Sequence, residues 1–278
     1  MNNLTRIVRE AVKFYLRNGY ASRDELERWQ SIIREAAVGE TADDYAGAVT
    51  RRLTQQYEYQ VDRAAALKRH PGISRFTISH LEPKLRAELD RRILVSTDLI
   101  KLNRTGAVNK TIQRFSGWAT SIPVRDYVGG GLSPSSRSGV KIGGDIVKDA
   151  ETLDYEARRV AIDQGHKLIA NIDNVIATSN NAIAAEWHSH WRQAGYNYRK
   201  DHKERDKQTY LIRGNWAQKN GYVKQGAAGC LDDITQPGEE VFCRCYVTYL
   251  YNLRSIPEDM LTQKGKKFME SMGGQKQN

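Results

Sequence analysis

The stretch DITQPGEEVFCRCYVTY, residues 233–249, decides the fold class of this chain. Its second half is rich in valine, tyrosine and threonine, which are side chains that favour β-strands. Pro237 and Gly238 stand just before that half, and a proline followed by a glycine is typical of a tight turn. The run Thr209-Tyr-Leu-Ile-Arg213 has the same texture. The sequence therefore predicts strands in the last third of the chain, with residues 241–249 as one of them.

The first 70 residues have the pattern of three amphipathic helices, because apolar side chains recur there at spacings of three and four. Gly19 is expected to end the first helix. Ser22 and Glu25 form a capping-box pattern that opens the second. The third is predicted to run from Thr41 to about Arg69, just before a His-Pro-Gly sequence that breaks helices.

A fourth helix is predicted from Ser79 to about Ser121. Pro83 is expected in its first turn, where the missing N–H of proline does no harm, and Asn103 is a candidate interruption.

A further long helix is predicted from just after Asp149 to about Trp191, with Gly195 as its stop. His188 and His190 fall at the end of this predicted helix. Side chains two residues apart on a helix diverge by about 200°, so these two histidines are not expected to bind one ion unless the helix has already ended.

Residues 121–150 are dense in glycine and serine and lack helical periodicity, which predicts a connector loop. The clusters Gly129–Gly131 and Gly143–Gly144 raise the alternative of a phosphate cradle. Neither cluster matches a Walker or dinucleotide-binding pattern, so no nucleotide site is assigned.

These patterns together predict an α+β fold, with a mainly helical N-terminal region followed by a long helix and a small β-containing C-terminal domain. The expected parts are a helical region over 1–120, a Gly/Ser-rich connector loop over 121–150, a β-containing domain over 151–256, and a C-terminal helix with a polar tail over 257–278.

Composition narrows the class of protein. Mean hydropathy is −0.65 and no uninterrupted apolar run approaches the roughly 20 residues of a membrane helix, so neither a membrane span nor a secreted precursor is expected. The 3 cysteines cannot form a spread-out disulfide framework, which favours a reducing compartment. The net charge is +10, and the excess lies in residues 51–150. Such an excess fits either an anionic partner such as nucleic acid or a solvated helix surface.

The region from His188 to Cys245 holds the candidate metal ligands. On a strand Cys243 and Cys245 would point to the same face, with His202 as the best third ligand and Cys230 or His190 as a fourth. This set predicts a structural metal site, with zinc as the candidate ion. The alternative is that the cysteines are reduced, buried small residues.

A catalytic interpretation uses the same region. His188, His190, Asp201, His202 and Asp206 include residue types that serve as metal ligands and general bases in hydrolases and nucleases. The spacing is not specific, and no nucleophile pattern of the Ser-His-Asp or Cys-His kind stands out, so no catalytic residue is assigned.

An ordered set of motifs resembles the C-terminal domain of phage Mu F-like head morphogenesis proteins, which are also called minor capsid proteins. The set is an Arg-x-x-His element, a glycine in the middle, a Pro-Gly turn and a terminal Cys-Arg-Cys, and the residues that carry it are Arg199, His202, Gly221, Pro237, Gly238, Cys243, Arg244 and Cys245. The resemblance covers roughly residues 153–253, and residues 114–123 also look like the upstream part of such proteins. The Lys-Glu-Arg-Asp sequence after His202 and the short loop over 225–229 depart from the family pattern.

The resemblance implies a minor protein of a tailed phage or prophage, not an enzyme. Such a protein joins the portal vertex during procapsid assembly and stays inside the head, after a stage in the host cytoplasm. The implied partners are the portal protein, with scaffold or major capsid protein as further candidates. Alternatives are a metal-dependent hydrolase, nuclease or transferase delivered with the phage genome, and a cytoplasmic DNA-binding regulator. The regulator ranks last because no helix-turn-helix or zinc-finger spacing is present.

Double-stranded DNA is a further candidate partner because the basic excess is central in the sequence. The residues expected to contact it are Arg91, Arg92, Lys101, Arg104, Lys110 and Arg114.

Overall fold

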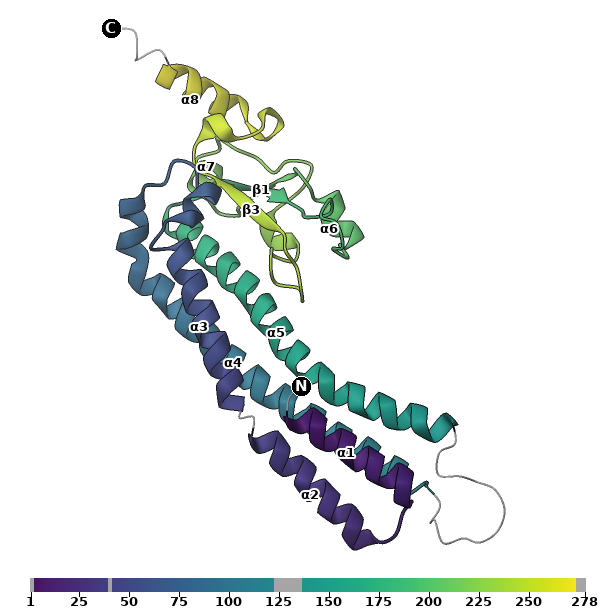
Figure 1. The fold of residues 1–278 in the computed structure, drawn as a ribbon. Helices are drawn as coiled ribbons and strands as arrows, with labels where there is room; N and C mark the ends of the chain where they lie inside the picture. Colours follow the sequence, from purple (N-terminus) through teal and green to yellow (C-terminus); the bar gives the residue numbers. More distant parts are fainter. Residues whose placement is uncertain (1–2, 40–41, 123–136, 274–278) are drawn as a thin grey trace. The chain divides into compact units, whose positions relative to one another are not determined.

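The protein is described by a computed structural model that covers residues 3–39, 42–122 and 137–273 (Figure 1). The fold is α+β, as predicted: helices dominate, and a small antiparallel sheet lies toward the C-terminus. The α-helices are α1 (Asn3–Asn18), α2 (Arg23–Gly39), α3 (Ala42–Gln60), α4 (Arg75–Ala119), α5 (Arg137–Ser179), α6 (Lys200–Glu204), α7 (Trp216–Lys219) and α8 (Gln263–Gly273). Short 3-10 helices are η1 (Ala65–Arg69), η2 (Leu231–Asp233), η3 (Leu253–Ser255) and η4 (Glu258–Met260).

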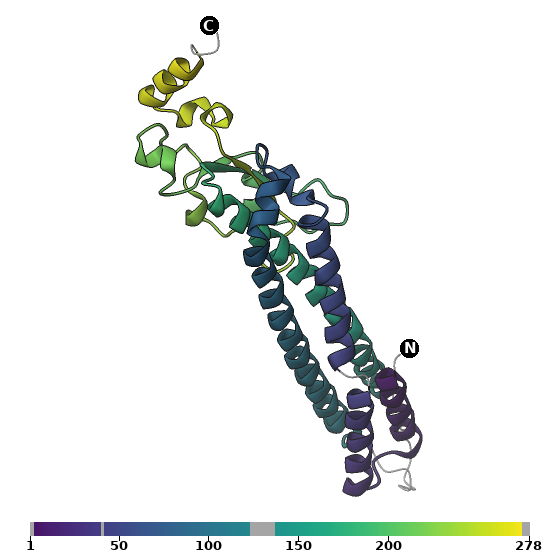
Figure 2. The same cartoon turned by 90° about the vertical axis from the view of Figure 1, so that its left-hand side faces the viewer.

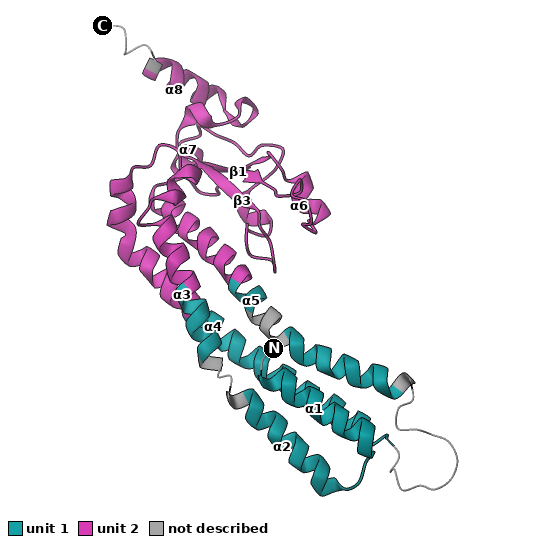
Figure 3. Ribbon diagram, in the orientation of Figure 1, with its two compact units in different colours: residues 1–51, 94–161 teal, residues 52–93, 162–278 magenta. Residues whose placement is uncertain are grey.

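The chain forms two compact units (Figure 3). Unit 1 consists of residues 1–51 and 94–161, and unit 2 of residues 52–93 and 162–278. The three points at which the chain passes from one unit to the other lie inside α3, α4 and α5.

Unit 1 is helical. Apolar faces of α1 and α2 pack with the later part of α4 and the first part of α5 around the fully buried rings of Tyr15 and Phe115, which meet edge to face with centroids 5.5 Å apart. The hydroxyl of Ser22 accepts the backbone N–H of Glu25 at 3.2 Å, which confirms the N-terminal cap predicted for the second helix.

In unit 2 the later part of α3, the first part of α4 and the later part of α5 run alongside one another (Figure 2). Side chains join them in pairs: Arg92 on α4 donates to the side chain of Gln164 on α5 at 3.1 Å, and Asn171 on α5 donates to Glu88 on α4 at 3.0 Å. The side chain of Gln56 on α3 lies directly against Gly165 on α5.

The sheet of unit 2 has the order β2-β1-β3, with β1 (Ala184–His188) antiparallel to both β2 (Thr209–Leu211) and β3 (Tyr246–Leu250). Alternate side chains enter two buried clusters. Trp187 and Tyr249 lie in one, with Ala177 of α5, while Ala184 and Leu250 lie in the other, where Phe268 of α8 packs. The first of these clusters also contains Cys243 and Cys245, so the sheet forms part of the core around the site described below.

A buried polar network ties η1 to α5 and to the end of β3. Asp173 on α5 accepts from Arg69 Nε at 2.5 Å and from His70 Nε2 at 3.2 Å, and His70 Nδ1 lies 2.5 Å from the hydroxyl of Tyr251. Both Asp173 and His70 are buried. The carboxylate is thus compensated by a cation inside the fold, as a buried charge requires.

Three predictions about the early helices are wrong. The third helix ends at Gln60 instead of about Arg69, because Ala64 adopts a left-handed conformation (φ 56°) before η1 begins. The fourth helix begins at Arg75, so Pro83 lies inside it and not in its first turn. Burial of Leu81, Leu85 and Leu89 offsets the hydrogen bond that the proline cannot make. The helix also continues through Asn103 without an interruption.

The connector predicted over 121–150 is also wrong in its second part, because α5 already begins at Arg137. Residues 123–136, which include the cluster 129–131, lie outside the described residues. Gly143 serves helix packing: a Cβ there would lie 2.7 Å from a methyl carbon of Val12 and 3.1 Å from the ring of Trp118.

The long helix does not continue to Trp191. It ends at Ser179, Asn181 takes a left-handed conformation (φ 56°), and residues 184–188 form the central strand β1. The prediction of a strand over 209–213 is confirmed by β2, whereas the strand predicted over 241–249 begins only at Tyr246. Residues 241–245 form a loop in which Phe242 has a φ of 61°. The helix expected near the C-terminus is present as η4 and α8, and the last five residues lie outside the described part.

Candidate metal centre

Three buried side chains of unit 2 form a cluster that could bind a metal ion: His202, Cys243 and Cys245. His202 lies on α6, and the cysteines lie in the loop that precedes β3. His202 Nδ1 is 3.7 Å from the sulfur of Cys243 and 3.5 Å from that of Cys245. The predicted meeting of these three residues is therefore found. Its geometry comes from an irregular loop and not from the strand alternation on which the prediction was based.

Helix α5 sets the path of this loop at two points. Gly238 has a φ of 78°, and a Cβ there would lie 3.2 Å from both the carbonyl oxygen of His166 and the Cβ of Ala170. At the second point the backbone N–H of Phe242 donates to Asp163 Oδ1 at 2.8 Å. The Pro-Gly turn is needed because the backbone both reverses here and approaches a helix closely.

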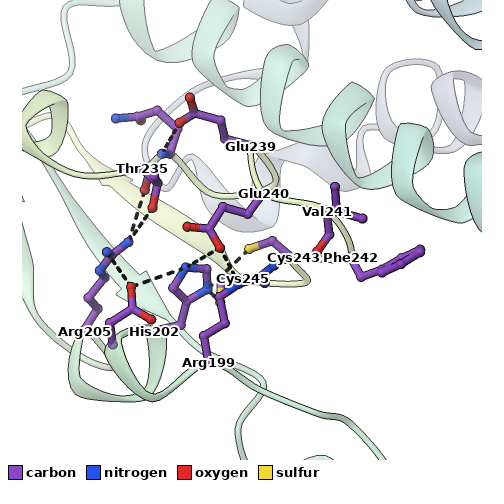
Figure 4. A network of polar contacts seen from close by, with 12 residues as sticks. Arg199, His202, Arg205, Thr235, Glu239, Glu240, Val241, Phe242, Cys243 and Cys245 are labelled. Carbon is purple, nitrogen blue, oxygen red and sulfur yellow. Dashed lines mark hydrogen bonds and ion pairs between the residues drawn. The ribbon is translucent and has the colours of Figure 1, made fainter. Parts of the chain in front are cut away.

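The second ring nitrogen of His202 faces a carboxylate. His202 Nε2 has no hydrogen-bond partner among the described residues, and Glu240 Oε2 lies 3.7 Å from it. Glu240 in turn forms an ion pair with Arg199, whose Nη2 donates to the carbonyl oxygen of Val241 at 3.0 Å (Figure 4). The Arg-x-x-His spacing thus places the arginine so that it holds the carboxylate beside the histidine.

Tyr196 holds the loop from the side opposite α5. Its hydroxyl donates to the carbonyl oxygen of Phe242 at 3.3 Å and accepts the backbone N–H of Arg244 at 3.3 Å. The guanidinium of Arg244 lies 5.1 Å from the centroid of the Tyr196 ring. Arg244 is therefore half-buried and stacked, and it is not a freely solvated side chain.

The two thiols of the cluster differ in pKa. A hydrogen bond from Cys245 lowers the pKa of Cys243 to about 6, with further help from the backbone N–H groups and from His202. The same hydrogen bond, together with burial, raises the pKa of Cys245. The shared hydrogen bond therefore favours loss of the first proton from Cys243, and a cation bound between the sulfurs would displace the second from Cys245.

Cys230, the predicted fourth ligand, does not join the cluster. It packs in the other buried cluster, with Leu211 and Leu253, and its thiol lies 3.6 Å from Gln225 Oε1. Its nearest acidic neighbours, Asp232 and Asp233, form ion pairs with Arg213. Burial raises the pKa of Cys230, so it stays a neutral thiol.

The structure brings together only part of the catalytic interpretation: Asp201 Oδ2 lies 3.8 Å from His202 Nε2, while His188 and Asp206 have other partners. His188 lies on β1 and contacts Thr248 and Lys207, while Asp206 accepts hydrogen bonds from the backbone of Ser189 and the indole of Trp191. His188 and His190 do not lie on a helix, because α5 ends at Ser179 and His188 belongs to β1. His188 stacks on Tyr246 and lies 2.9 Å from the hydroxyl of Thr248, so it is not part of the cysteine cluster.

Sequence reasoning missed Glu240 and Tyr196, which position the cluster. Glu240 stands in the stretch 233–249, but only its partner Arg199, some forty residues earlier, shows its role.

The six basic residues expected to contact DNA do not form one set. Arg91 and Arg92 belong to unit 2 and the other four to unit 1. The guanidinium of Arg104 is buried over the ring of Tyr45, Arg114 pairs with Asp149, and Arg92 is bonded to Gln164. Lys101 and Lys110 are exposed, and Arg91 is half exposed beside Glu88.

Comparison with models of protein families, with curated proteins and with solved structures found no match. Among the helices that the structure describes, none combines the length and apolar character needed to cross a membrane.

Proposed function

We propose that the protein is a minor capsid, or head morphogenesis, protein of a tailed bacteriophage or prophage. The observation that supports this most is the convergence of the motif residues. The Arg-x-x-His element and the Pro-Gly and Cys-Arg-Cys elements are separated by more than thirty residues, yet they build one buried cluster in unit 2. Their order in the sequence is the basis of the resemblance, and their contacts give that order a physical reason.

In this proposal the role is structural. The protein binds the portal during procapsid assembly and remains with the head, and scaffold or major capsid protein are further candidate partners. The cluster is buried inside unit 2 and is not itself a docking surface. The portal would therefore be bound by the helical faces or by the outer surface of unit 2.

We also propose that the cluster binds zinc. Tetrahedral zinc with Zn–S bonds of about 2.3 Å and Zn–N bonds of about 2.0–2.1 Å places sulfur and nitrogen about 3.6 Å apart. The separations of His202 Nδ1 from the two sulfurs, 3.7 and 3.5 Å, are close to this value. Glu240 would then accept the Nε2 proton of the bound histidine, which is the usual arrangement around a zinc-binding imidazole.

The assembly role is tested by quantitative mass spectrometry of phage particles. DNA-filled heads, empty heads and precursor heads made without portal protein are compared. We expect a few copies per head, lost when the portal is absent. If no particle contains the protein, the assembly role is wrong.

The zinc site is tested by metal analysis of the purified chain and two matched cysteine variants. Cys245→Ser is expected to lose the metal, whereas Cys230→Ser, which alters an equally buried cysteine outside the cluster, is expected to retain it. A chelator should lower the melting temperature of the wild type, because metal binding stabilises the folded state alone. Equal metal content in the two variants would contradict the assignment.

A metal-dependent hydrolase or nuclease is the second candidate. It is favoured by one observation: three protein ligands leave a fourth position open, as in catalytic zinc sites. The burial of all three ligands favours the structural role instead. The effect of His202→Ala separates the two, since loss of nuclease activity with an intact fold indicates catalysis, and unfolding indicates a structural site.

A further inference from the structure

Unit 2 contains a large open cleft with a volume of about 1100 Å³, which lies beside the metal cluster. Its walls come from α5, from the loops that follow β1 and β2, from the Pro-Gly turn and from β3. Ligand pockets commonly have volumes of about 300–1,000 Å³, so this cleft can hold a small molecule or a segment of a polymer.

The lining is basic. It includes six Lys or Arg residues and three Asp or Glu residues, with two histidines in addition. Each acidic side chain of the lining already has a partner. Asp173 is paired with Arg69 and Asp232 with Arg213, and the exposed Glu239 accepts the backbone N–H of Gln236. Of the other basic residues, Lys167 pairs with Asp163 and Arg92 donates to Gln164, whereas Arg244 forms no ion pair with any described residue.

Three of the basic groups gather at one place. They are His166 on α5, His190 after β1 and Arg244 in the cysteine loop, and all three line the cleft. Burial lowers the pKa of His166, and the nearby charges of Arg244 and His190 lower it further, so the His166 ring is held neutral beside them.

These groups lack partners for their charge. Among the described residues, no carboxylate lies within ion-pair distance of Arg244, whose guanidinium lies over the ring of Tyr196. His190 Nδ1 is buried without a hydrogen-bond partner in the same described part of the chain. Cationic or donor groups that face one cavity and have no carboxylate as a direct partner are the usual elements of an oxyanion site.

We propose that this cleft binds a phosphate group, with Arg244 as the main ligand and His166 and His190 as additional donors. Arginine suits the role because its planar guanidinium can bind two phosphate oxygens at once. The backbone N–H of Arg244 is bonded to the Tyr196 hydroxyl and its guanidinium lies over the Tyr196 ring, so both ends of the arginine contact this tyrosine before a ligand arrives. The phosphate can belong to a free nucleotide or to the backbone of a nucleic acid. The inference goes beyond the assembly role and does not depend on it.

The test is calorimetric titration of the full chain at fixed ionic strength. The probes are inorganic phosphate, adenosine 5′-monophosphate, a 12-nucleotide single strand and polyglutamate. The variants are Arg244→Gln and His166→Gln, with Arg254→Gln as the control, since Arg254 is an exposed arginine of unit 2 outside the cleft. Melting temperatures are measured on all of them. His166→Gln keeps the test valid if Arg244→Gln does not fold, because the His166 ring takes part in no hydrogen bond of the described structure.

We expect one-site binding of phosphate or of the mononucleotide, weakened at least about tenfold by Arg244→Gln and several-fold by His166→Gln, and unchanged by Arg254→Gln. Binding of the oligonucleotide alone, with the same dependence on the variants, identifies the phosphodiester backbone as the source. The proposal is overturned if no phosphate-bearing probe binds, if polyglutamate alone binds, or if the cleft variants bind as the control does.

Discussion

The two ring nitrogens of His202 have different neighbours, and this difference determines how the side chain could bind a metal ion. Nδ1 faces two sulfurs, and Nε2 faces the carboxylate of Glu240, which Arg199 holds in place. A carboxylate behind a metal-bound imidazole fixes the orientation of the ring and makes the nitrogen a better donor. The residues that determine how His202 could bind a metal therefore include Glu240 and Arg199 as well as the three candidate ligands.

At the residue scale, Glu240→Gln is expected to weaken zinc binding by about 10- to 100-fold, because the amide keeps the shape but not the charge behind His202. Competition with a chromogenic chelator measures the change. The matched control is Glu239→Gln, since the neighbouring carboxylate is exposed and accepts only the backbone N–H of Gln236. Equal zinc affinity in both variants would show that Glu240 has no such role.

Asp206 provides a second prediction at this scale. Burial alone would raise its pKa, but hydrogen bonds from the Ser189 backbone and the Trp191 indole outweigh burial and lower it. The stabilisation is therefore present above the unfolded-state pKa near 3.8 and is lost as the pH falls through the lower folded-state value. Asp206→Asn is expected to cost about 1–2 kcal/mol at pH 7 and progressively less below pH 4.

Urea unfolding of wild type and variant at several pH values measures the difference in their free energies of unfolding. All other titrating groups are common to both proteins, so their contributions cancel in this difference. Asp259→Asn, which changes an exposed carboxylate of the same unit, serves as the control. A difference that stays constant down to pH 3 would contradict the role assigned to the ionised carboxylate.

At the scale of elements, two adjacent glycines of α5 have opposite surroundings. A Cβ at Gly143 would collide with Val12 and Trp118, whereas Gly144 has nothing within 4 Å. Gly143→Ala is therefore expected to destabilise the protein by about 1–3 kcal/mol. Gly144→Ala should stabilise it by up to about 1 kcal/mol through helix propensity. Thermal unfolding of both variants checks this, and equal effects would contradict the close packing of α1 on α5.

The elements were predicted where a local pattern decides them. The capping box at Ser22, the strand at Thr209 and the α+β class follow from neighbouring residues. The change from α5 to β1 was missed because the apolar residues around 182–187 continue the helical pattern, and only the left-handed Asn181 and the pairing with β2 and β3 end it. The three metal ligands could be predicted by residue type, but Glu240 and Tyr196 act through partners about forty residues away.

At the scale of the whole molecule, the basic excess of the sequence is partly absorbed by the fold. Arg104 and Arg114 contact Tyr45 and Asp149 within unit 1, and Arg92 contacts Gln164 within unit 2. The side chains of Lys101 and Lys110 are exposed, and on that ground we propose these two as the residues that contact DNA. Replacing both lysines by glutamine is expected to lower the slope of log K against log salt by about 2, because each phosphate contact contributes about 0.9.

Fluorescence anisotropy with a labelled duplex at several salt concentrations measures that slope. The control replaces Lys13 and Lys141, two exposed lysines of the same unit, by glutamine. Arg104→Gln should instead lower stability and leave the slope unchanged. If the Lys101 and Lys110 variant keeps the wild-type slope, the central basic residues do not bind DNA.

The chain passes from one unit to the other inside α3, α4 and α5, and this limits how the coding sequence can recombine. Each unit is assembled from two separate stretches of sequence. Residues 1–51 need residues 94–161 to complete unit 1, and residues 162–278 need residues 52–93 to complete unit 2. A single recombination event at any internal point therefore divides at least one core. Exchange of one unit between related genomes would require a crossover at each of the three boundaries, near residues 51, 93 and 161, so the two units are expected to be inherited together.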